Sequence, residues 1–391
     1  MKKLLLAGAV AVAFSAHAGV LPNEAAQPLV KEGNVASSKG QYQLALEKYS
    51  EAMKADPEAS IPLSSIARVL SLAADQSTGE QAERLRRQAE GAARQALRLA
   101  SNDPLAQEVL RTLEDTQEPP LHKPSPEVWK QMQEAEILFQ SGQYDEARAK
   151  YEGAAQLDPQ YSPAWVYAAD CFYLQKNWPE AEVRFRKATE IEPLNAQAWR
   201  YLADTLAWEG KTSASEDALL KGIAAQPSQL PTWNKLGALR NKAGAPLTQL
   251  KLEPRAYSVY DAQSSKYTVH VNSPEGAEKK DADLAVWMML AIGDAQYRMD
   301  KQQSKTTLSP FAAELAAWTN AMKVADEVAA NGLQLKEPGL QAMQTLYKAD
   351  QLEPALLLLR YKESYRPELE TWKKEHPHGV RTFIATYGLA P

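Results

Sequence analysis

A 34-residue interval recurs in the central part of this chain of 391 residues. Two residue types keep the interval in phase: tryptophan at Trp165, Trp199 and Trp233, and proline at Pro159, Pro193 and Pro227. A period of this length corresponds to one helix–turn–helix unit, and such units stack because none can bury its apolar face alone. The spacing therefore predicts an all-α fold, an α-solenoid of helix hairpins, which offers an extended surface.

One period shows the expected pair of helical faces. A first helix has its apolar face at the spacing i, i+3, i+4 and i+7, in Trp165, Ala168, Ala169 and Phe172. A second helix has Ala181, Phe185 and Ala188 on its matching face, and Pro193 ends it. The small alanines let the two helices approach closely, while the large rings fill the space to the next unit.

The same pattern occurs in other segments. The preceding segment carries Ala135, Leu138, Gly142, Ala147, Tyr151, Ala154 and Pro159, and an N-terminal segment carries Gly33, Gly40, Tyr42, Ala45, Tyr49, Ala52 and Pro57. These residues resemble the tetratricopeptide repeat family, closely over about 128–245 and well over 26–59. The resemblance implies a non-enzymatic scaffold that binds proteins or peptides. Within that family the chain is similar to exported bacterial members.

The order of these patterns predicts six segments. They are a signal peptide at 1–18, an N-terminal repeat-like block at 19–114, a Pro-rich connector at 115–127, the main repeat array at 128–248, a β-hairpin at 249–272, and a helical C-terminal region at 273–391 with a degenerate repeat and capping helices. Alternating apolar residues around 257–271 predict the hairpin. Asn331 and Gly332 predict the end of a helix in the C-terminal region.

The first 18 residues resemble an export signal. Lys2 and Lys3 precede an apolar run from Leu4 to Phe14, and small residues around Ala16 and Ala18 suit cleavage after Ala18. The run is too short for a membrane-spanning helix, which needs about 20 apolar residues. We expect a periplasmic or secreted protein without a membrane span. Its mildly acidic charge, formally −5 for the whole chain, argues against binding to nucleic acid.

In tetratricopeptide repeats the first helices line a concave groove, and the resemblance transfers that role to matching positions. The predicted groove residues are Glu136, Phe139, Val166, Asp170, Tyr173, Arg200, Asp204, Trp208, Asn234 and Asn241. Family members that clamp a peptide carboxylate place Asn where this chain has Glu136, Asp170 and Asp204. An acidic groove with aromatic walls suits a neutral or basic extended segment better. The alternative is that these carboxylates merely pair with Arg200 and nearby lysines.

Candidate chemistry is sparse. No Gly-rich phosphate loop, Gly-x-Ser-x-Gly elbow or paired-histidine zinc motif occurs, so we expect no enzyme, cofactor or metal. Cys171 is the only cysteine and fits a small apolar role within a helix better than a reactive thiol. His376 and His378 flank Pro377 and fit a surface turn better than a metal site.

Three functions compete on this basis. The favoured hypothesis is a periplasmic scaffold that holds a cell-envelope protein or an extended peptide segment in its concave groove, for envelope assembly or maintenance. The alternative is a binding subunit for polysaccharide or peptidoglycan fragments, whose sugar rings would stack on Tyr173 and Trp208. An enzyme with its site in the C-terminal region is the third hypothesis.

Overall fold

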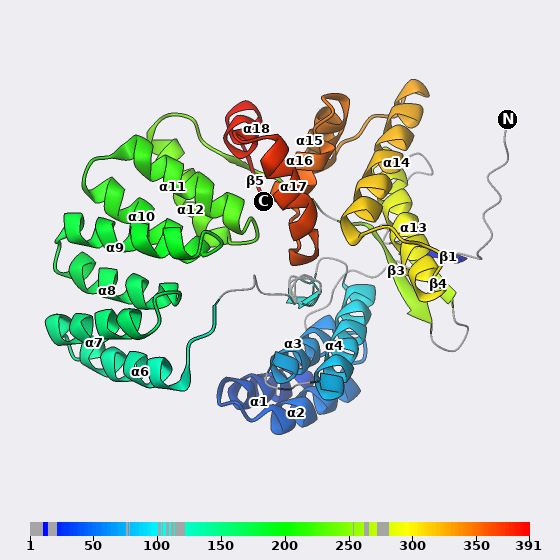
Figure 1. Ribbon diagram of the computed structural model, residues 1–391. Coiled ribbons are helices and arrows are strands. Elements are labelled where there is room, and N and C mark those ends of the chain that lie inside the picture. The colour runs from blue at the N-terminus through cyan, green and yellow to red at the C-terminus, as the bar shows by residue number, and fades with distance from the viewer. Residues whose placement is uncertain are drawn as a thin grey trace. The chain divides into compact units, whose positions relative to one another are not determined.

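The computed structural model of this chain forms two compact units, each built from two separate stretches of sequence (Figure 1). Unit 1 comprises Met1–Thr116 and Lys251–Leu352, and unit 2 comprises Gln117–Leu250 and Glu353–Pro391. The structure describes residues 11–14, 22–75, 77, 79–100, 103, 105, 106, 109, 110, 113, 122–252, 254–261, 266–271 and 281–391.

The repeat array in unit 2 consists of consecutive antiparallel helix pairs (Figure 1). Its helices are α6 (Pro126–Gln140), α7 (Tyr144–Leu157), α8 (Ser162–Leu174), α9 (Trp178–Ile191), α10 (Ala196–Trp208), α11 (Thr212–Ala225) and α12 (Leu230–Lys242). The first helices also contact one another, α8 with α10 and α10 with α12. The predicted all-α solenoid of helix hairpins is confirmed.

Alternation of small and large residues fills the core of this array. Ala181 and Ala188 on α9 are fully buried, and the ring of Phe185 lies buried between them along the helix. Where the pattern has Gly222 in place of alanine, a Cβ would lie 3.1 Å from Thr232 and 3.2 Å from Trp199. The second helix of that repeat therefore approaches its neighbours more closely than an alanine would allow.

The chain has a left-handed backbone at one fixed position just after the first helix of each repeat. Gly142, Gly210 and Gly244 occupy it with φ of 80°, 75° and 75°. Lys176 occupies the same position in the second repeat with φ of 60°. A Cβ at Gly142 or Gly210 would meet nothing within 4 Å. These glycines are therefore required by backbone conformation alone, and Lys176 carries the corresponding strain.

The array ends without a second helix after α12, as the sequence predicts. A short strand, β2 (Thr248–Gln249), follows and pairs in parallel with β5 (Leu389–Ala390). Unit 2 resumes at Glu353, within α16 (Leu352–Leu359). It then contains the short 3₁₀ helix η1 (Glu363–Tyr365), α17 (Arg366–Glu375) and α18 (Gly379–Tyr387) before β5. α18 contacts α11, so the C-terminal helices cover the last complete repeat.

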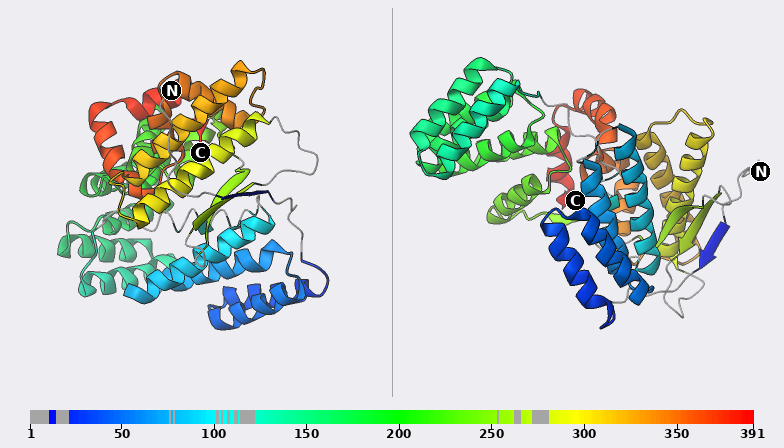
Figure 2. Two further views of the ribbon diagram at one scale, coloured as in Figure 1. Left: turned by 90° about the vertical axis from the view of Figure 1, so that its right-hand side faces the viewer. Right: turned by 90° about the horizontal axis from the view of Figure 1, so that it is seen from below.

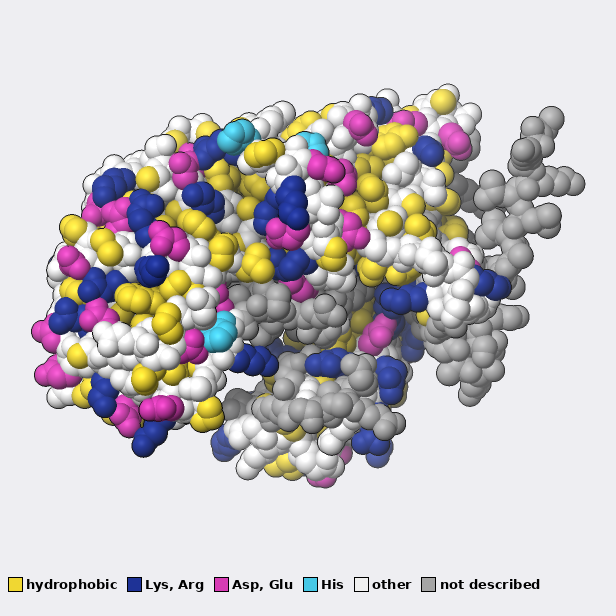
Figure 3. All heavy atoms as spheres, viewed as in Figure 1, with side chains coloured by type: hydrophobic (Ala, Val, Ile, Leu, Met, Phe, Trp, Pro, Cys, Tyr) yellow, Lys and Arg dark blue, Asp and Glu magenta, His cyan; other side chains and the backbone are white. Residues whose placement is uncertain are grey.

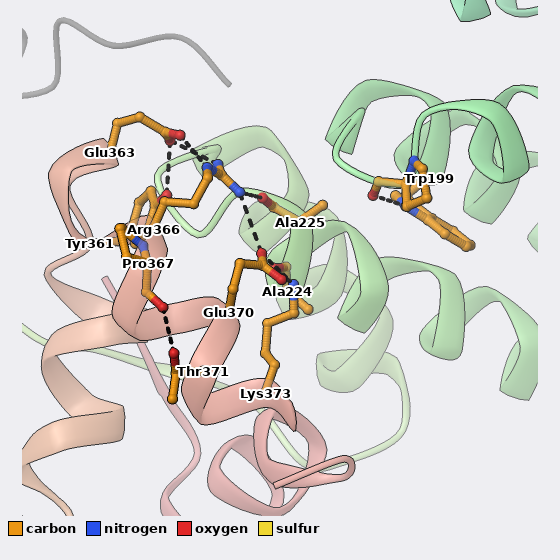
Figure 4. A network of polar contacts seen from close by, with 11 residues as sticks. Trp199, Ala224, Ala225, Tyr361, Glu363, Arg366, Pro367, Glu370, Thr371 and Lys373 are labelled. Atoms are coloured by element: carbon orange, nitrogen blue, oxygen red, sulfur yellow. Dashed lines mark hydrogen bonds and ion pairs between the residues drawn. The ribbon is translucent and has the colours of Figure 1, made fainter. Parts of the chain in front are cut away.

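Two cations from α17 satisfy the carbonyl end of α11 (Figure 4). Arg366 donates to the carbonyl of Ala225 at 3.1 Å, and Lys373 donates to that of Ala224 at 3.1 Å. Glu363, which is buried, holds the guanidinium of Arg366. The last carbonyls of a helix lack partners within the helix and carry partial negative charge, which positive side chains stabilise.

Unit 1 combines N-terminal helix pairs with a small sheet and two long helices (Figures 1 and 2). Its helices are α1 (Ala26–Ser38), α2 (Tyr42–Ala55), α3 (Ser60–Asp75), α4 (Gly79–Leu99), α13 (Ala282–Gln302), α14 (Pro310–Ala330) and α15 (Pro338–Lys348). Gly33 is required in the first pair because a Cβ there would lie 2.5 Å from the ring of Tyr49. The predicted helix end at Asn331 is confirmed, since it follows α14 directly.

The predicted β-hairpin is present in unit 1. β3 (Ala256–Asp261) and β4 (Lys266–Val271) pair antiparallel, and the expected turn at 262–265 lies outside the described residues. β1 (Ala11–Phe14) adds to β4 in parallel, which gives the strand order β1-β4-β3. Both hairpin strands contact α13.

A charged network joins the two stretches of sequence that form unit 1. Glu90 on α4 accepts from Arg94 and from Arg298 of α13, each at 2.9 Å. Arg298 also pairs with Asp294, whose carboxylate accepts from the hydroxyl of Ser258 on β3. α4, α13 and β3 are therefore tied together although they are far apart in the sequence.

The described end of the Pro-rich connector is held by the first two repeats. The backbone N–H of His122 donates to Glu192 Oε1 at 2.6 Å, and its Nε2 lies 2.8 Å from Asp158 Oδ2. Asp158 and Glu192 occupy equivalent positions, one period apart in the sequence.

Over the described residues, helices are either too short or too polar to cross a membrane.

Candidate functional site

The predicted groove residues come from corresponding turns of the first helices. α6, α8 and α10 carry Glu136, Asp170 and Asp204 at the 34-residue interval. Because these helices are equivalent elements of successive repeats, the three carboxylates form a row on one side of the array. We call this side the first-helix face, and the side formed by α7, α9 and α11 the second-helix face.

A pocket of about 220 Å³ opens on the first-helix face. Its lining residues are Phe139, Asp170, Tyr173, Leu174, Phe185, Tyr201 and Asp204. Four of these were predicted from the sequence: Phe139, Asp170, Tyr173 and Asp204. The pocket thus combines aromatic walls with two carboxylates from adjacent repeats.

The three carboxylates in the row differ in their partners. Glu136 accepts from the Tyr151 hydroxyl at 2.9 Å and from the Gln140 amide at 2.9 Å. Asp204 forms an ion pair with Lys235, whose Nζ lies 2.6 and 2.7 Å from its two oxygens. Among the described residues, Asp170 has neither an ion-pair nor a hydrogen-bond partner for its side chain. The alternative of simple internal pairing therefore holds for Asp204 but not for Asp170.

The surroundings of Asp170 disfavour its charged form. Burial, followed by the nearby negative charge of Glu136, raises the pKa of Asp170 from 3.8 to about 7. No partner of opposite charge among the described residues offsets these effects. Asp170 is consequently close to half protonated near neutral pH, which is unusual for an aspartate and typical of functional sites.

An aromatic cluster lies beside the pocket. The indole ring of Trp208 stacks on that of Trp178 with centroids 5.7 Å apart and planes 9° apart. Trp208 donates its indole N–H to the hydroxyl of Tyr173 at 2.9 Å, and Tyr173 meets Trp178 edge-on at 5.0 Å. Trp208 is nevertheless 65% exposed, so a rigidly held aromatic surface faces solvent.

The remaining predicted groove residues lie outside the pocket lining. Arg200 is half-buried, with its guanidinium carbon 5.3 Å from the ring centroid of Tyr201. Asn234 and Asn241 are exposed on α12. Val166 is only 3% exposed, so the prediction that it faces the groove is wrong: its side chain belongs to the core.

Sequence reasoning missed three pocket residues and Trp178. Tyr201 could have been found, because it stands one period before Lys235 and one period after Tyr167, at one fixed repeat position. Leu174 likewise shares its repeat position with Trp208. Phe185 and Trp178 belong to α9, a second helix, and the family pattern gives no signal that they reach this side.

The other candidate residues have structural roles. Cys171 is fully buried, and its thiol donates to the Tyr167 carbonyl at 3.4 Å. Burial raises the pKa of Cys171 to about 12, which makes the thiol unreactive. His376 follows α17 directly and stacks on Trp372 at 5.3 Å, and α18 begins at Gly379. The predicted turn at Pro377 is confirmed.

Comparison with known proteins agrees with this repeat architecture. Residues 138–200 match the family model described as tetratricopeptide repeat. No curated protein sequence matches the chain. Solved structures similar to it include the first tetratricopeptide domain of Spaghetti (RPAP3) bound to the HSP90 peptide SRMEEVD, with 17% identity over 32% of this chain and 98% of that chain and a TM-score of 0.29.

Two further structures cover more of the chain. The TPR2AB domain of yeast Sti1, in a complex with pHSP90, has 14% identity over 56% of this chain and 98% of that chain, with a TM-score of 0.29. YrrB, described as a tetratricopeptide protein with an unusual peptide-binding site, has 19% identity over 54% and 91%, with a TM-score of 0.24. At such values these neighbours say nothing about ligands of this chain.

The period of the sequence, the consecutive helix pairs and the matched family model agree. The chain contains tetratricopeptide repeat sequence at residues 138–200, and the same helix-pair architecture extends from α6 to α11.

Proposed function

We propose that this protein is a non-enzymatic scaffold that binds an extended segment of a protein or peptide along its first-helix face. The pocket around Asp170 is the observation that carries the proposal, because it joins aromatic walls to a carboxylate without a partner among the described residues. A partly buried, unpaired charge costs folding free energy. Its presence on an open face is accounted for if a ligand supplies the partner.

The aromatic cluster supports the same proposal. Trp208 is held by Trp178 and Tyr173 in one orientation although it is largely exposed. Rigid aromatic side chains provide large contact areas at low cost in conformational entropy, and they are enriched where proteins bind partners. Pocket and cluster share Tyr173, so one extended segment would contact both.

Selection from a random peptide display library tests this function. We expect the purified protein to enrich peptides that lose at least tenfold in affinity for the Trp208→Ala variant. The matched control is Lys187→Ala, which removes an exposed side chain on the second-helix face. Equal binding by all three proteins would contradict a role for the first-helix face, and a failure to enrich any peptide would contradict the proposed function.

Export to the cell envelope is a further part of the proposal. It is supported by the sequence of residues 1–18, which includes β1 and resembles a cleavable signal. Mass spectrometry of the protein recovered from fractionated bacterial cells should give Gly19 as the first residue of a periplasmic or secreted form. Recovery of an uncleaved form from the cytoplasm would contradict export.

One observation favours a second candidate, binding of polysaccharide or peptidoglycan fragments. Sugar rings stack on flat, exposed aromatic surfaces. Trp208 offers such a surface, and the ring of Trp178 stacks on its other face. Titration with soluble peptidoglycan fragments, followed by tryptophan fluorescence, distinguishes this candidate. A saturable change that disappears in Trp208→Ala would favour the glycan, and no change would leave the peptide as the ligand.

A further inference from the structure

We propose that the pocket around Asp170 binds a cationic side chain, a lysine or an arginine, of the segment held on the first-helix face. This inference rests on the proposed function and names the ligand chemistry that the pocket selects. It is carried by a comparison between two successive repeats within the chain.

The chain itself provides a cation at the equivalent place one repeat later. Asp204 corresponds to Asp170, and its carboxylate is bound by the ammonium group of Lys235 at 2.6 and 2.7 Å. Lys235 belongs to α12, the first helix of the following unit. The repeat geometry therefore brings position 235 onto the carboxylate of the preceding repeat.

The residue that corresponds to Lys235 opposite Asp170 is Tyr201, one period earlier in the sequence. A tyrosine at this position gives Asp170 no cation. Tyr201 instead forms a wall of the pocket together with Phe139 and Tyr173. Asp170 therefore supplies a carboxylate like that of Asp204, but no lysine of the chain stands opposite it. The pocket has room for an ammonium group from a ligand.

The walls also suit a cation. Aromatic faces attract ammonium and guanidinium groups electrostatically. Tyrosine and phenylalanine additionally pack against the methylene chain of lysine or arginine. A carboxylate combined with aromatic rings is therefore a better match for a long cationic side chain than for an apolar one or an anion.

The charges that face Asp170 favour the same ligand. Glu136 on α6 adds negative potential. Asp204 on α10 also lines the pocket, but the charge of Lys235 on α12 balances it. Arg200 on α10 lies against Tyr201. On α8 itself, Tyr167, Cys171 and Tyr173 are the neighbouring titratable groups. Of these charges, that of Glu136 acts on Asp170, and its negative potential favours a cation.

Binding should be coupled to the loss of a proton. Because burial and Glu136 raise the pKa of Asp170 to about 7, the carboxyl is largely ionised at pH 8 and largely protonated at pH 6. A cation binds the ionised form. The preference for a cationic side chain should therefore fall about tenfold from pH 8 to pH 6, in proportion to the ionised fraction.

Two heptapeptide libraries that differ only in the central residue test the inference. One has lysine at the centre and the other has norleucine, which has a similar aliphatic chain without the charge. We expect wild-type protein at pH 8 to retain the lysine library about tenfold more strongly, as measured by mass spectrometry of bound peptides. Equal retention of both libraries would overturn the inference.

Three variants locate the preference. Asp170→Asn, which is nearly isosteric, should abolish it, and Tyr201→Lys should abolish it by supplying an internal ammonium group. Lys235→Tyr frees Asp204 and should create a second cation pocket, with two lysines retained per protein from suitably spaced peptides. Circular dichroism confirms folding, and Asp170→Asn alone decides the question if the Tyr201 variant does not fold. A preference that persists in Asp170→Asn would overturn the inference.

The result separates this inference from the proposed function. Peptides retained equally with lysine or norleucine, but lost in Trp208→Ala, would contradict the cation pocket and leave the peptide scaffold intact. Retention of neither library would contradict both. A lysine preference that is lost at pH 6 and in Asp170→Asn would support both.

Discussion

The two faces of the repeat array differ in how completely their acidic side chains are paired with cations. On the second-helix face, carboxylates have cationic partners: Arg184 pairs with Glu152 at 2.6 Å and with Glu180 at 2.7 Å, and Lys211 pairs with Glu182 at 2.6 Å. On the first-helix face, Asp170 has no such partner among the described residues. Acidic and basic side chains are interspersed over much of the array surface (Figure 3).

The pKa values of one residue from each face express this difference. Burial raises the pKa of Glu182, but hydrogen bonds that include those from Lys211 and Arg186 outweigh it and lower the pKa to about 2. Burial and Glu136 raise the pKa of Asp170 to about 7. The comparison teaches that the second-helix face uses charge for stability, whereas the first-helix face keeps a charge whose partner has to come from elsewhere.

The largest effect on the free energy of unfolding should come from the residue that both faces share. Phe185 extends from α9 and is fully buried, yet it also lines the pocket. We expect Phe185→Ala to lower the free energy of unfolding by about 3–5 kcal/mol, because it leaves a cavity in the core. Urea unfolding followed by tryptophan fluorescence measures this. Leu174→Ala is the control, because Leu174 lines the same pocket but is 48% exposed. A similar loss of stability in this variant would contradict the core role of Phe185.

Removal of the charge at Asp170 should stabilise the protein at alkaline pH. The folded-state pKa is raised from 3.8 to about 7, so ionisation costs folding free energy that accumulates as the pH rises through this range. We expect Asp170→Asn to be more stable than wild type by about 1–3 kcal/mol at pH 8, and no more stable below pH 4. Unfolding at several pH values measures the difference.

Glu182→Gln should have the opposite sign and sharpens the same comparison. Its folded-state pKa is lowered from 4.5 to about 2, so its ionised form stabilises the protein above pH 4.5 and loses this effect as the pH falls toward 2. We expect a loss of about 1 kcal/mol at pH 7. Effects of equal sign for the Asp170 and Glu182 variants would break the distinction between the faces.

The turn that joins the two faces should show a smaller effect. Lys176 has the left-handed backbone that Gly142 and Gly210 have in the neighbouring repeats. Lys176→Gly should therefore raise the free energy of unfolding by about 0.5–1 kcal/mol. The reciprocal control is Gly210→Ala, which should lower it by about 1 kcal/mol without a steric clash. Destabilisation by Lys176→Gly would contradict the strain at this turn.

The ion pair on the first-helix face should contribute least to the free energy of unfolding. Asp204 and Lys235 have side chains that are 26% and 40% exposed, so water screens their attraction. A double-mutant cycle with Asp204→Asn and Lys235→Met should give a coupling of about 0.5 kcal/mol that decreases with added salt. A coupling of several kcal/mol would contradict the screening of this pair by water.

The sequence predicts the repeat helices well because their signals are local. Trp165, Trp199 and Trp233 each fall on the fourth residue of a first helix. The indoles of Trp199 and Trp233 donate to the carbonyls of Pro193 and Pro227, which lie in the loops just before their helices. The hairpin strands follow equally from the alternating residues around 257–271. Such features depend on periodicity and on turn residues, which a single chain displays directly.

The sequence pattern does not predict features that depend on packing between distant parts of the chain. No local signal tells that β2 pairs with β5, or that Arg298 reaches Glu90. The candidate site was predictable by position but not by partner. The family pattern places Asp170 and Asp204 on one row. Only the residues that follow them on the first helix of the next repeat, Tyr201 and Lys235, decide which carboxylate is neutralised.

The strand pair β2–β5 and the Arg298–Glu90 ion pair each join stretches that the ribosome makes at very different times. Unit 1 begins before residue 117 but lacks α13 and α14 until synthesis reaches 330, and unit 2 lacks its final strand until 390. Unit 1 therefore cannot close before residue 352 has been made, and unit 2 cannot close before its final strand has been made. Until the end of the chain is made, α11 therefore lacks the cover that α18 gives it in the complete protein, and its apolar surface is exposed to other proteins.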